Sequence, residues 1–184
     1  SDVTLGYVWA SSVDVSKSIS DFCVTSGMTP SPFDCWLAER GLLTFRLRYQ
    51  KAQDNAIRLA KAMSEHPNIS KILYPLRQDH PDFATAQNLL GNQGCNMVSF
   101  ELAEKTREAA NRLVENLQEI AFAPTLGDIG TTLSHPASSS HRGLSIEERS
   151  LLGISEGFFR VSVGIEDGDT LIDVFSQALS KLAL

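Results

Sequence analysis

The chain has 184 residues, 42% of them hydrophobic, which is enough for one medium-sized domain with a packed core. Its 22 acidic residues outnumber its 16 basic ones and no basic run is present, so the composition argues against nucleic acid as a partner. No apolar stretch reaches the roughly 20 residues of a membrane span, and residues 1–10 lack the basic region of a signal peptide. Cys23, Cys35 and Cys95 have no CxxC spacing, so we expect buried thiols in a reducing cytoplasm, with no disulfide and no zinc site.

The first third of the chain is predicted to be mainly helical. A strand is expected at residues 3–9; it begins without a preceding turn or cap, which is typical of a chain that continues upstream. Ser31 and Pro32 indicate a helix start, with serine as the cap and proline in the first turn. Gly41 is expected to end that helix. The patterns predict helices at residues 12–26, 31–41 and 44–65.

From residue 68 onward, strands and helices alternate along the chain. Short apolar or alternating runs between turn residues predict strands at 69–73, 96–102, 120–124 and 157–167. Apolar residues at helical spacing predict helices at 81–90, 104–119, 145–153 and 170–182. Ser145 and Glu148 form a capping box at the start of the third of these helices. This order is typical of an α/β (α+β) fold, in which a small mixed or antiparallel sheet is covered by helices.

Residues 125–144 are predicted to form a long loop rich in serine, threonine, histidine and glycine. Loops of this length in compact domains are usually functional or disordered. Ser138, Ser139 and His141 are the nearest approach to a hydrolase set, but the chain has no GxSxG nucleophile elbow. His135 and His141 lack an acidic or cysteine ligand at a usual spacing, so a metal site is not expected.

The last predicted strand carries an arginine in its middle. Phe159 and Val161 alternate with Arg160, Ser162 and Gly164, so one face of the strand is apolar and the other is polar. In one interpretation the polar face is solvated and the arginine is at most paired with a nearby carboxylate. In the other, the arginine lines a pocket and binds a carboxylate ligand, which its planar fork of donors matches. The strand pattern leaves both interpretations open.

Segments along the whole chain, taken in order, resemble one known family. They include "SPFDCWLAERGLLTFRLR" (31–48), "NAIRLAKAMSEHPNISKILYP" (55–75), "MVSFEL" (97–102), "TLGDIGTTLSHPASSSHRGLSIEERSLLGI" (125–154) and "FRVSVGIEDGDTLIDVFSQAL" (159–179). They are similar to the C-terminal half of the Cys/Met-metabolism family of pyridoxal-phosphate enzymes. That family includes cystathionine γ-synthase, cystathionine β- and γ-lyases, methionine γ-lyase and O-acetylhomoserine sulfhydrylase.

The resemblance implies a fold and a division of the chain. The expected fold is the C-terminal small domain of the fold-type I (aspartate aminotransferase-like) pyridoxal-phosphate transferases. Residues 1–30 would be the end of the large cofactor-binding domain, residues 31–66 connecting helices, and residues 67–184 the small domain. The parent protein would be a homo-oligomer, a tetramer built as a dimer of dimers, in the cytoplasm.

The resemblance also implies roles for four residues. Arg160 stands where the family's "R-SVGIE" arginine binds the α-carboxylate of the amino-acid substrate. Thr125 and Leu126 stand in the family's "SLG" segment near that carboxylate, with threonine in place of serine. Gly130 replaces a glutamate that lines the side-chain pocket in many members, so a wider and less acidic pocket is expected.

The resemblance places the cofactor lysine in a "SATK" motif that this sequence does not contain. The chain is therefore expected to supply no catalytic or cofactor-binding residue, and to bind no pyridoxal phosphate by itself. The parent would be a lyase or synthase acting on cystathionine, methionine or an activated homoserine. The residues leave open which of these it is, and whether the specificity is β or γ. The alternative is a stand-alone, non-catalytic amino-acid-binding or structural domain derived from the family.

Overall fold

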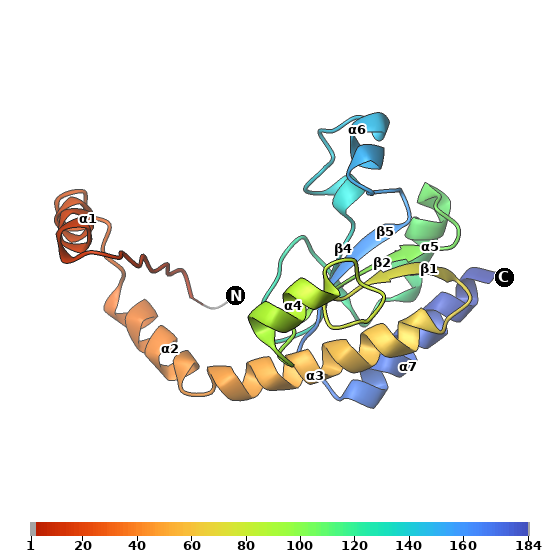
Figure 1. The fold of residues 1–184 in the computed structure, drawn as a ribbon, viewed down its shortest axis with the longest axis horizontal. Coiled ribbons are helices and arrows are strands. Elements are labelled where there is room, and N and C mark those ends of the chain that lie inside the picture. The colour runs from red at the N-terminus through yellow and green to blue at the C-terminus, as the bar shows by residue number, and fades with distance from the viewer. Residues whose placement is uncertain (1–2, 184) are drawn as a thin grey trace. The chain divides into compact units, whose positions relative to one another are not determined.

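A computed structural model describes residues 3–183 of the chain (Figure 1). The chain divides into two compact units, one ending at Leu47 and the other beginning at Arg48. No helix among the described residues is long and apolar enough to cross a membrane. The domain boundaries expected from the sequence stay predictions.

The first unit contains helices α1 (Val13–Thr25) and α2 (Pro32–Leu42) and the start of α3 (Phe45–Ser64). The predicted cap of α2 is confirmed, because Ser31 Oγ accepts a hydrogen bond from Asp34 N at 3.1 Å. Neither α1 nor α2 contains a buried residue. The expected burial of the thiols was therefore wrong here, since Cys35 on α2 is exposed and Cys23 on α1 is only partly buried.

Two further predictions for this unit were wrong. Residues 3–9 form no strand, since no described segment offers them the hydrogen-bonding partner that a strand needs. Gly41 does not end α2 but lies inside it. Gly41 therefore needs no left-handed backbone, whereas Gly27, after α1, adopts φ 71° as a helix-terminating glycine does.

The second unit is built on a five-stranded sheet in the order β1-β2-β5-β4-β3. Its strands are β1 (Ile69–Leu73), β2 (Met97–Leu102), β3 (Ala121–Phe122), β4 (Thr132–Ser134) and β5 (Phe158–Ser162). All neighbouring strands pair antiparallel except β3 and β4, which are parallel. The predicted small mixed sheet is confirmed.

Strand β4 corrects the prediction of an unbroken loop from 125 to 144. Thr132, Leu133 and Ser134 are all buried and pair with β5. A three-residue run with two polar members gives no usable periodicity, so only the pairing with β5 makes it a strand. Because β4 pairs with β5, the loop segments before and after β4 both lie near the strand that carries Arg160.

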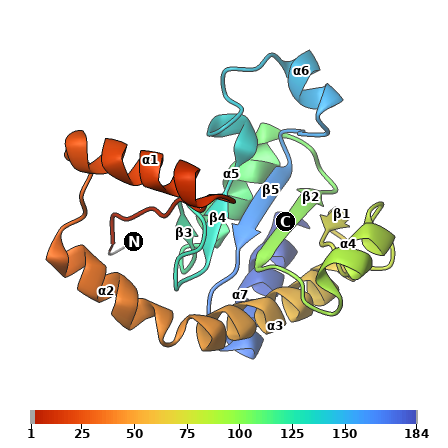
Figure 2. The ribbon, with the colours of Figure 1, turned by 60° about the vertical axis from the view of Figure 1, so that its left-hand side comes forward.

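Helices α3, α5 (Arg107–Asn116) and α7 (Gly168–Ser180) pack on one face of the sheet, and α3 and α7 run beside each other (Figures 1 and 2). Phe100 and Phe159 stack at the centre of this face, with ring centroids 5.3 Å apart. The largest fully buried side chains are Tyr74, Phe100, Phe159, Phe175, Leu59, Leu102, Leu113, Leu117, Leu133, Leu179, Val98 and Val161. One continuous core therefore lies between the sheet and these helices.

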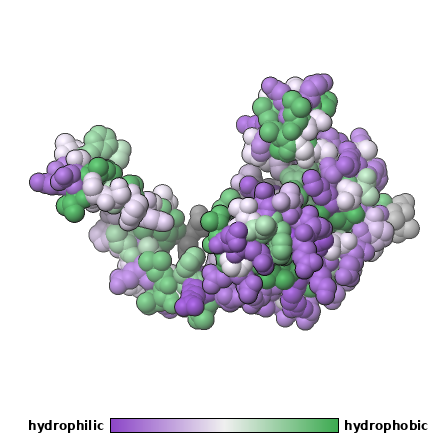
Figure 3. All heavy atoms as spheres, viewed as in Figure 1, coloured by the Kyte–Doolittle hydropathy of each residue, from purple (hydrophilic) through white to green (hydrophobic). Residues whose placement is uncertain are grey.

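The remaining helices lie outside this core. Helix α4 (Phe83–Leu90) ends at Gly91 as predicted, and α6 (Ile146–Leu151) has the predicted capping box between Ser145 and Glu148. Two short 3₁₀ turns cover Pro136–Ser138 and Lys181–Ala183. Helix α6 exposes the apolar side chains of Ile146 and Leu151. Hydrophobic atoms are visible on the surface around this helix in Figure 3.

Candidate functional site

Arg160 lies in the middle of β5, on the sheet face opposite the helices. Its neighbours across the sheet are Ser99 on β2 and Ser134 on β4. Both neighbours are small, and the Ser134 hydroxyl donates to the Arg160 carbonyl oxygen at 3.3 Å. The space beside the guanidinium is therefore not filled by a large side chain from either flanking strand.

The guanidinium of Arg160 has no partner within residues 3–183, and its Nε is buried without a hydrogen bond. Arg107 and Arg149, in contrast, each form an ion pair with Glu156. A buried donor that stays unsatisfied costs about 1–3 kcal/mol. The strand alone left open whether Arg160 is solvated or binds a ligand. An unpartnered buried Nε favours a site that is completed by a carboxylate.

The loop after β3 is hydrogen-bonded to the end of the Arg160 strand. Gly127 N–H donates to Ser162 Oγ at 2.9 Å, and Ile165 N–H donates to the Ile129 carbonyl at 3.0 Å. Because Ser162 follows Arg160 by two residues, both side chains point to the same face of the sheet. The structure thus brings the loop that contains Thr125 and Leu126 to the face of Arg160. The two side chains themselves are exposed.

Gly130 lies beside a carboxylate that the sequence reasoning did not identify as part of the site. A Cβ added at Gly130 would lie 3.8 Å from Glu166 Oε1 and would meet nothing closer. Glu166 accepts hydrogen bonds from Thr131, one from its N–H and one of 2.9 Å from its hydroxyl. The "GIED" segment could have signalled Glu166, because a carboxylate that follows a buried glycine by two residues needs a partner if it is itself partly buried.

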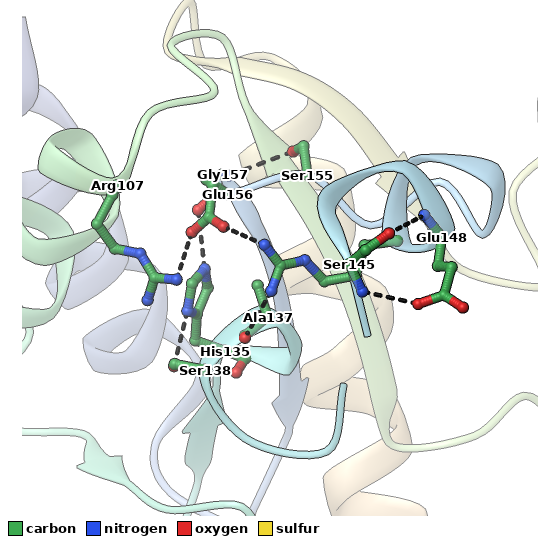
Figure 4. Close-up of polar contacts among 10 residues, drawn as sticks. Arg107, His135, Ala137, Ser138, Ser145, Glu148, Ser155, Glu156 and Gly157 are labelled. Atoms are coloured by element: carbon green, nitrogen blue, oxygen red, sulfur yellow. Dashed lines mark hydrogen bonds and ion pairs between the residues drawn. The ribbon is translucent and has the colours of Figure 1, made fainter. Parts of the chain in front are cut away.

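His135, which precedes a proline, is held on the packed side of the sheet (Figure 4). Its ring is 3% exposed and lies 4.9 Å from that of Phe159. Its Nδ1 lies 2.8 Å from Ser138 Oγ and its Nε2 lies 2.8 Å from the Glu156 carbonyl oxygen. Burial lowers the pKa of His135, which favours the neutral form of the ring.

This geometry gives a structural role to Ser138 and Ser139, two of the three residues that most nearly resemble a hydrolase set in the sequence. Ser138 pairs with His135 and not with His141, and the second ring nitrogen of His135 meets a carbonyl instead of a carboxylate. Ser139 Oγ donates to the His135 carbonyl at 2.8 Å. The hydroxyls of Ser138 and Ser139 therefore stabilise the turn after β4. Ser140 Oγ does lie 2.8 Å from His141 Nδ1, but these are adjacent residues on an exposed turn.

Glu156 joins the elements around this turn (Figure 4). Its carboxylate pairs with Arg107 at 2.6 Å and with Arg149 at 2.8 Å. Arg149 also donates to the Ala137 carbonyl at 3.2 Å. The cluster joins α5, the turn after β4, α6 and the start of β5 through a single carboxylate that is shared by two arginines.

The described part of the chain offers no site for a pyridoxal aldimine. A Schiff-base lysine lies in a pocket with its amine near neutrality, whereas all six lysines of the sequence are exposed. Among residues 3–183 there is also no group of three or more metal-ligating side chains. The residues present therefore do not fit the cofactor by themselves.

Comparisons with known proteins agree with the fold. The profile of the family "Cys/Met metabolism PLP-dependent enzyme" matches residues 1–180. Cystathionine beta-lyase of Bacillus subtilis is 38% identical to this chain, and the alignment covers 100% of this chain and 46% of the relative. O-succinylhomoserine sulfhydrylase of Pseudomonas aeruginosa is 35% identical, and the alignment covers 97% of this chain and 44% of the relative. The crystal structure of cystathionine gamma synthase from Xanthomonas oryzae pv. oryzae, in complex with aminoacrylate and cysteine, superposes with a TM-score of 0.85. The alignment covers 95% of this chain and 44% of that one, at 30% identity.

Proposed function

Because the chain belongs to the Cys/Met-metabolism family of pyridoxal-phosphate-dependent enzymes, we propose that it is the C-terminal part of a trans-sulfuration enzyme and supplies the arginine that binds the substrate carboxylate. The chain spans less than half the length of the relatives described above. The fold-class prediction is confirmed by the superposition on a member of the family. Activity, substrate and assembly are proposals for the longer protein.

The observation that carries this proposal is the unpartnered guanidinium of Arg160. Its Nε is buried and has no acceptor, and its cross-strand neighbours are two serines. A substrate α-carboxylate would supply two acceptor oxygens to the fork and neutralise its charge. A carboxylate that is held at both oxygens has a fixed position and plane, which helps to orient the substrate for reaction.

Three loop residues are proposed to complete the substrate site. Thr125 would offer its hydroxyl to the carboxylate, with Leu126 beside it, and both lie in the loop that is bonded to β5. Gly130 would leave room for the distal part of the substrate, since a Cβ at this position would have no contact closer than 3.8 Å. The substrate class is a small sulfur amino acid or an activated homoserine, as the names of the relatives suggest.

Pyridoxal phosphate would act as the electron sink of such an enzyme, and its lysine is expected outside these 184 residues. The role of this chain would then be to bind the substrate carboxylate, to orient the substrate and to shape the side-chain pocket. A homo-oligomer in the cytoplasm, a tetramer built as a dimer of dimers, is proposed along with the family assignment.

The test is Arg160→Lys in the full-length protein. Lysine keeps the charge but offers a point donor in place of a bidentate fork. We expect kcat/KM to fall by on the order of tens to thousands, since losing a charge-assisted pair to a ligand costs roughly 2–5 kcal/mol. The thermal midpoint should not change, because the side chain lies outside the core.

A matched control is Arg112→Lys. Arg112 lies on α5, its side chain is 44% exposed, and it pairs with Glu104 at the surface. This variant should keep wild-type kinetics. Kinetics within about twofold of wild type for Arg160→Lys would return Arg160 to the solvated-face interpretation.

A further inference from the structure

We propose that Thr131, Glu166 and Asn55 are positioning residues that fix the loop 125–131 on the end of the Arg160 strand. The proposal rests on the function proposed above for Arg160, and it adds residues that reach the substrate only through other residues. We call this hydrogen-bonded set the loop latch. It consists of Asn55 on α3, Thr131 before β4 and Glu166 after β5.

Thr131 is the centre of the latch. It is 4% exposed, and both its N–H and its hydroxyl donate to the Glu166 carboxylate. The same hydroxyl oxygen accepts a hydrogen bond from Gly164 N–H at 2.9 Å. One side chain thus binds both the backbone and the side chain of the segment after β5. Hydrogen bonds to a carboxylate are about twice as strong as neutral ones.

Asn55 connects this segment to helix α3. It is 2% exposed, and its Nδ2 donates to the Gly164 carbonyl at 3.1 Å and the Glu166 carbonyl at 2.9 Å. Its Oδ1 is buried without a partner, so the two carbonyls alone determine how the amide is oriented. These contacts join residues more than 100 positions apart in the sequence, and they hold the end of β5 on the rigid core helix.

The glycine between these partners lets the loop lie directly on the strand. A Cβ added at Gly164 would overlap the Ile129 carbonyl oxygen and would lie 2.7 Å from both the Gly130 carbonyl carbon and Glu166 Oε2. No side chain fits there without moving the loop. The close approach also explains why Ile165 N–H reaches the Ile129 carbonyl at 3.0 Å.

The exposed part of the loop contacts the end of β5 through Gly127 and Ile129, and the latch holds the buried end of the loop. Residues 124–129 are all exposed, and burial begins only at Thr131. An exposed segment without buried contacts opens at low free-energy cost. A carboxylate site shared between such a loop and Arg160 would bind the substrate more weakly unless the loop were anchored at its buried end, because ordering a mobile loop costs binding free energy.

The chain offers a matched control on the same two elements. Arg58 on α3 pairs with Asp169 at the start of α7, and their side chains are 46% and 80% exposed. This pair joins α3 to the segment after β5 as Asn55 does, but it does not touch the loop. Arg58→Ala therefore removes a contact between the same elements and leaves the latch intact.

The first experiment measures amide hydrogen exchange in the 184-residue chain. In Thr131→Val we expect the amides of Gly164 and Ile165 to exchange at least about tenfold faster, because the valine removes a buried acceptor and a charge-assisted donor. Thr131→Ser should restore protection, and Arg58→Ala should leave it unchanged. Unchanged exchange in Thr131→Val would overturn the latch, whatever the function of Arg160.

The second experiment measures kinetics of the full-length protein loaded with pyridoxal phosphate, with L-cystathionine as substrate. Thr131→Val should raise KM about tenfold and change kcat by less than about threefold, because a loosened loop weakens substrate binding. Thr131→Ser should stay near wild type. If Thr131→Val fails to fold, Glu166→Gln replaces it as the test. This variant keeps the shape of the side chain without its charge, and it should also raise KM.

The two experiments separate this inference from the proposed function. If Arg160→Lys lowers kcat/KM while Thr131→Val loosens the loop and leaves KM unchanged, the positioning role is overturned and the role of Arg160 stands. If Arg160→Lys leaves the kinetics unchanged, the proposed function fails, and with it the reason for calling the latch a positioning device.

Discussion

The two faces of the sheet in the second unit are formed by the same strands but differ in how their side chains are satisfied. On the helix-covered face, Phe100, Phe159 and Val161 have no exposed surface and pack into one core. On the other face, Arg160 has small polar neighbours and keeps a buried Nε without a partner. One face is satisfied by the protein alone, and the other is left incomplete.

The difference shows how a strand can carry stability and chemistry at once. Because successive side chains point to opposite faces, a ligand-binding residue can sit between two core residues without disturbing either. Apolar burial needs only matching shape and volume, whereas a carboxylate site needs an unpaired donor that is held in place. Substitutions on the two faces should therefore separate stability from substrate binding.

The largest expected effect is on the packed face. Phe159→Ala should lower the free energy of unfolding of the chain by about 3–5 kcal/mol, since it leaves a cavity beside Phe100 and the His135 ring. Urea unfolding monitored by circular dichroism measures this. Arg160→Lys is the comparison, with no expected change, and equal losses in the two variants would refute the division between the faces.

The next effect is on the open face, at Gly130. In the full-length protein, Gly130→Glu should change the ratios of kcat/KM among cystathionine, methionine and O-acetylhomoserine by about tenfold, because the new carboxylate adds charge beside Glu166. Gly130→Gln has the same shape without the charge and should change the ratios less. Equal ratios in wild type and Gly130→Glu would show that position 130 does not line the substrate pocket.

A smaller effect concerns pH and the histidine on the packed face. Burial holds the pKa of His135 below its ordinary value of 6.5, so the unfolded chain takes up a proton at a higher pH than the folded chain does. The free energy of unfolding should therefore be highest above pH 6.5 and fall as the pH decreases toward the folded pKa. The slope should be at most about 1.4 kcal/mol per pH unit.

The comparison for this prediction is His135→Gln, measured by urea unfolding between pH 5 and pH 8. The variant should be less stable at neutral pH and should show a weaker dependence on pH. Burial also lowers the pKa of His66, so His66→Gln serves as the control for the remaining slope. A slope that is the same in His135→Gln as in wild type would contradict the assignment.

The smallest effect is expected outside both faces, at the cap of α6. Ser145→Ala removes the hydrogen bond from Glu148 N to Ser145 Oγ, which measures 3.2 Å, and should cost about 1 kcal/mol or less. Ser150→Ala on the same exposed helix is the matched control. Thermal unfolding measures the difference, and substrate kinetics of the full-length protein should stay unchanged in both variants.

Local sequence patterns determined much of this fold. The strand at 69–73 and the capping box at Ser145 and Glu148 were predicted as the structure has them. The end of α4 at Gly91 was predicted as well. These features depend on residues within a few positions of one another, where period, caps and glycine conformation act directly. The alternation around Arg160 likewise predicted a strand with one apolar and one polar face.

Only the tertiary structure decided which of these residues meet. Residues 3–9 have the composition of a strand but lack a partner, while Thr132–Ser134 have no strand pattern and become β4 because β5 lies beside them. The latch of Asn55, Thr131 and Glu166 joins three distant parts of the chain, and no local pattern records such a contact. The sequence supplied the arginine and its resemblance to a family. The packing of loop, strand and helix determined that its Nε is buried, unpaired and next to an anchored loop, because burial and pairing depend on neighbours that are remote along the chain.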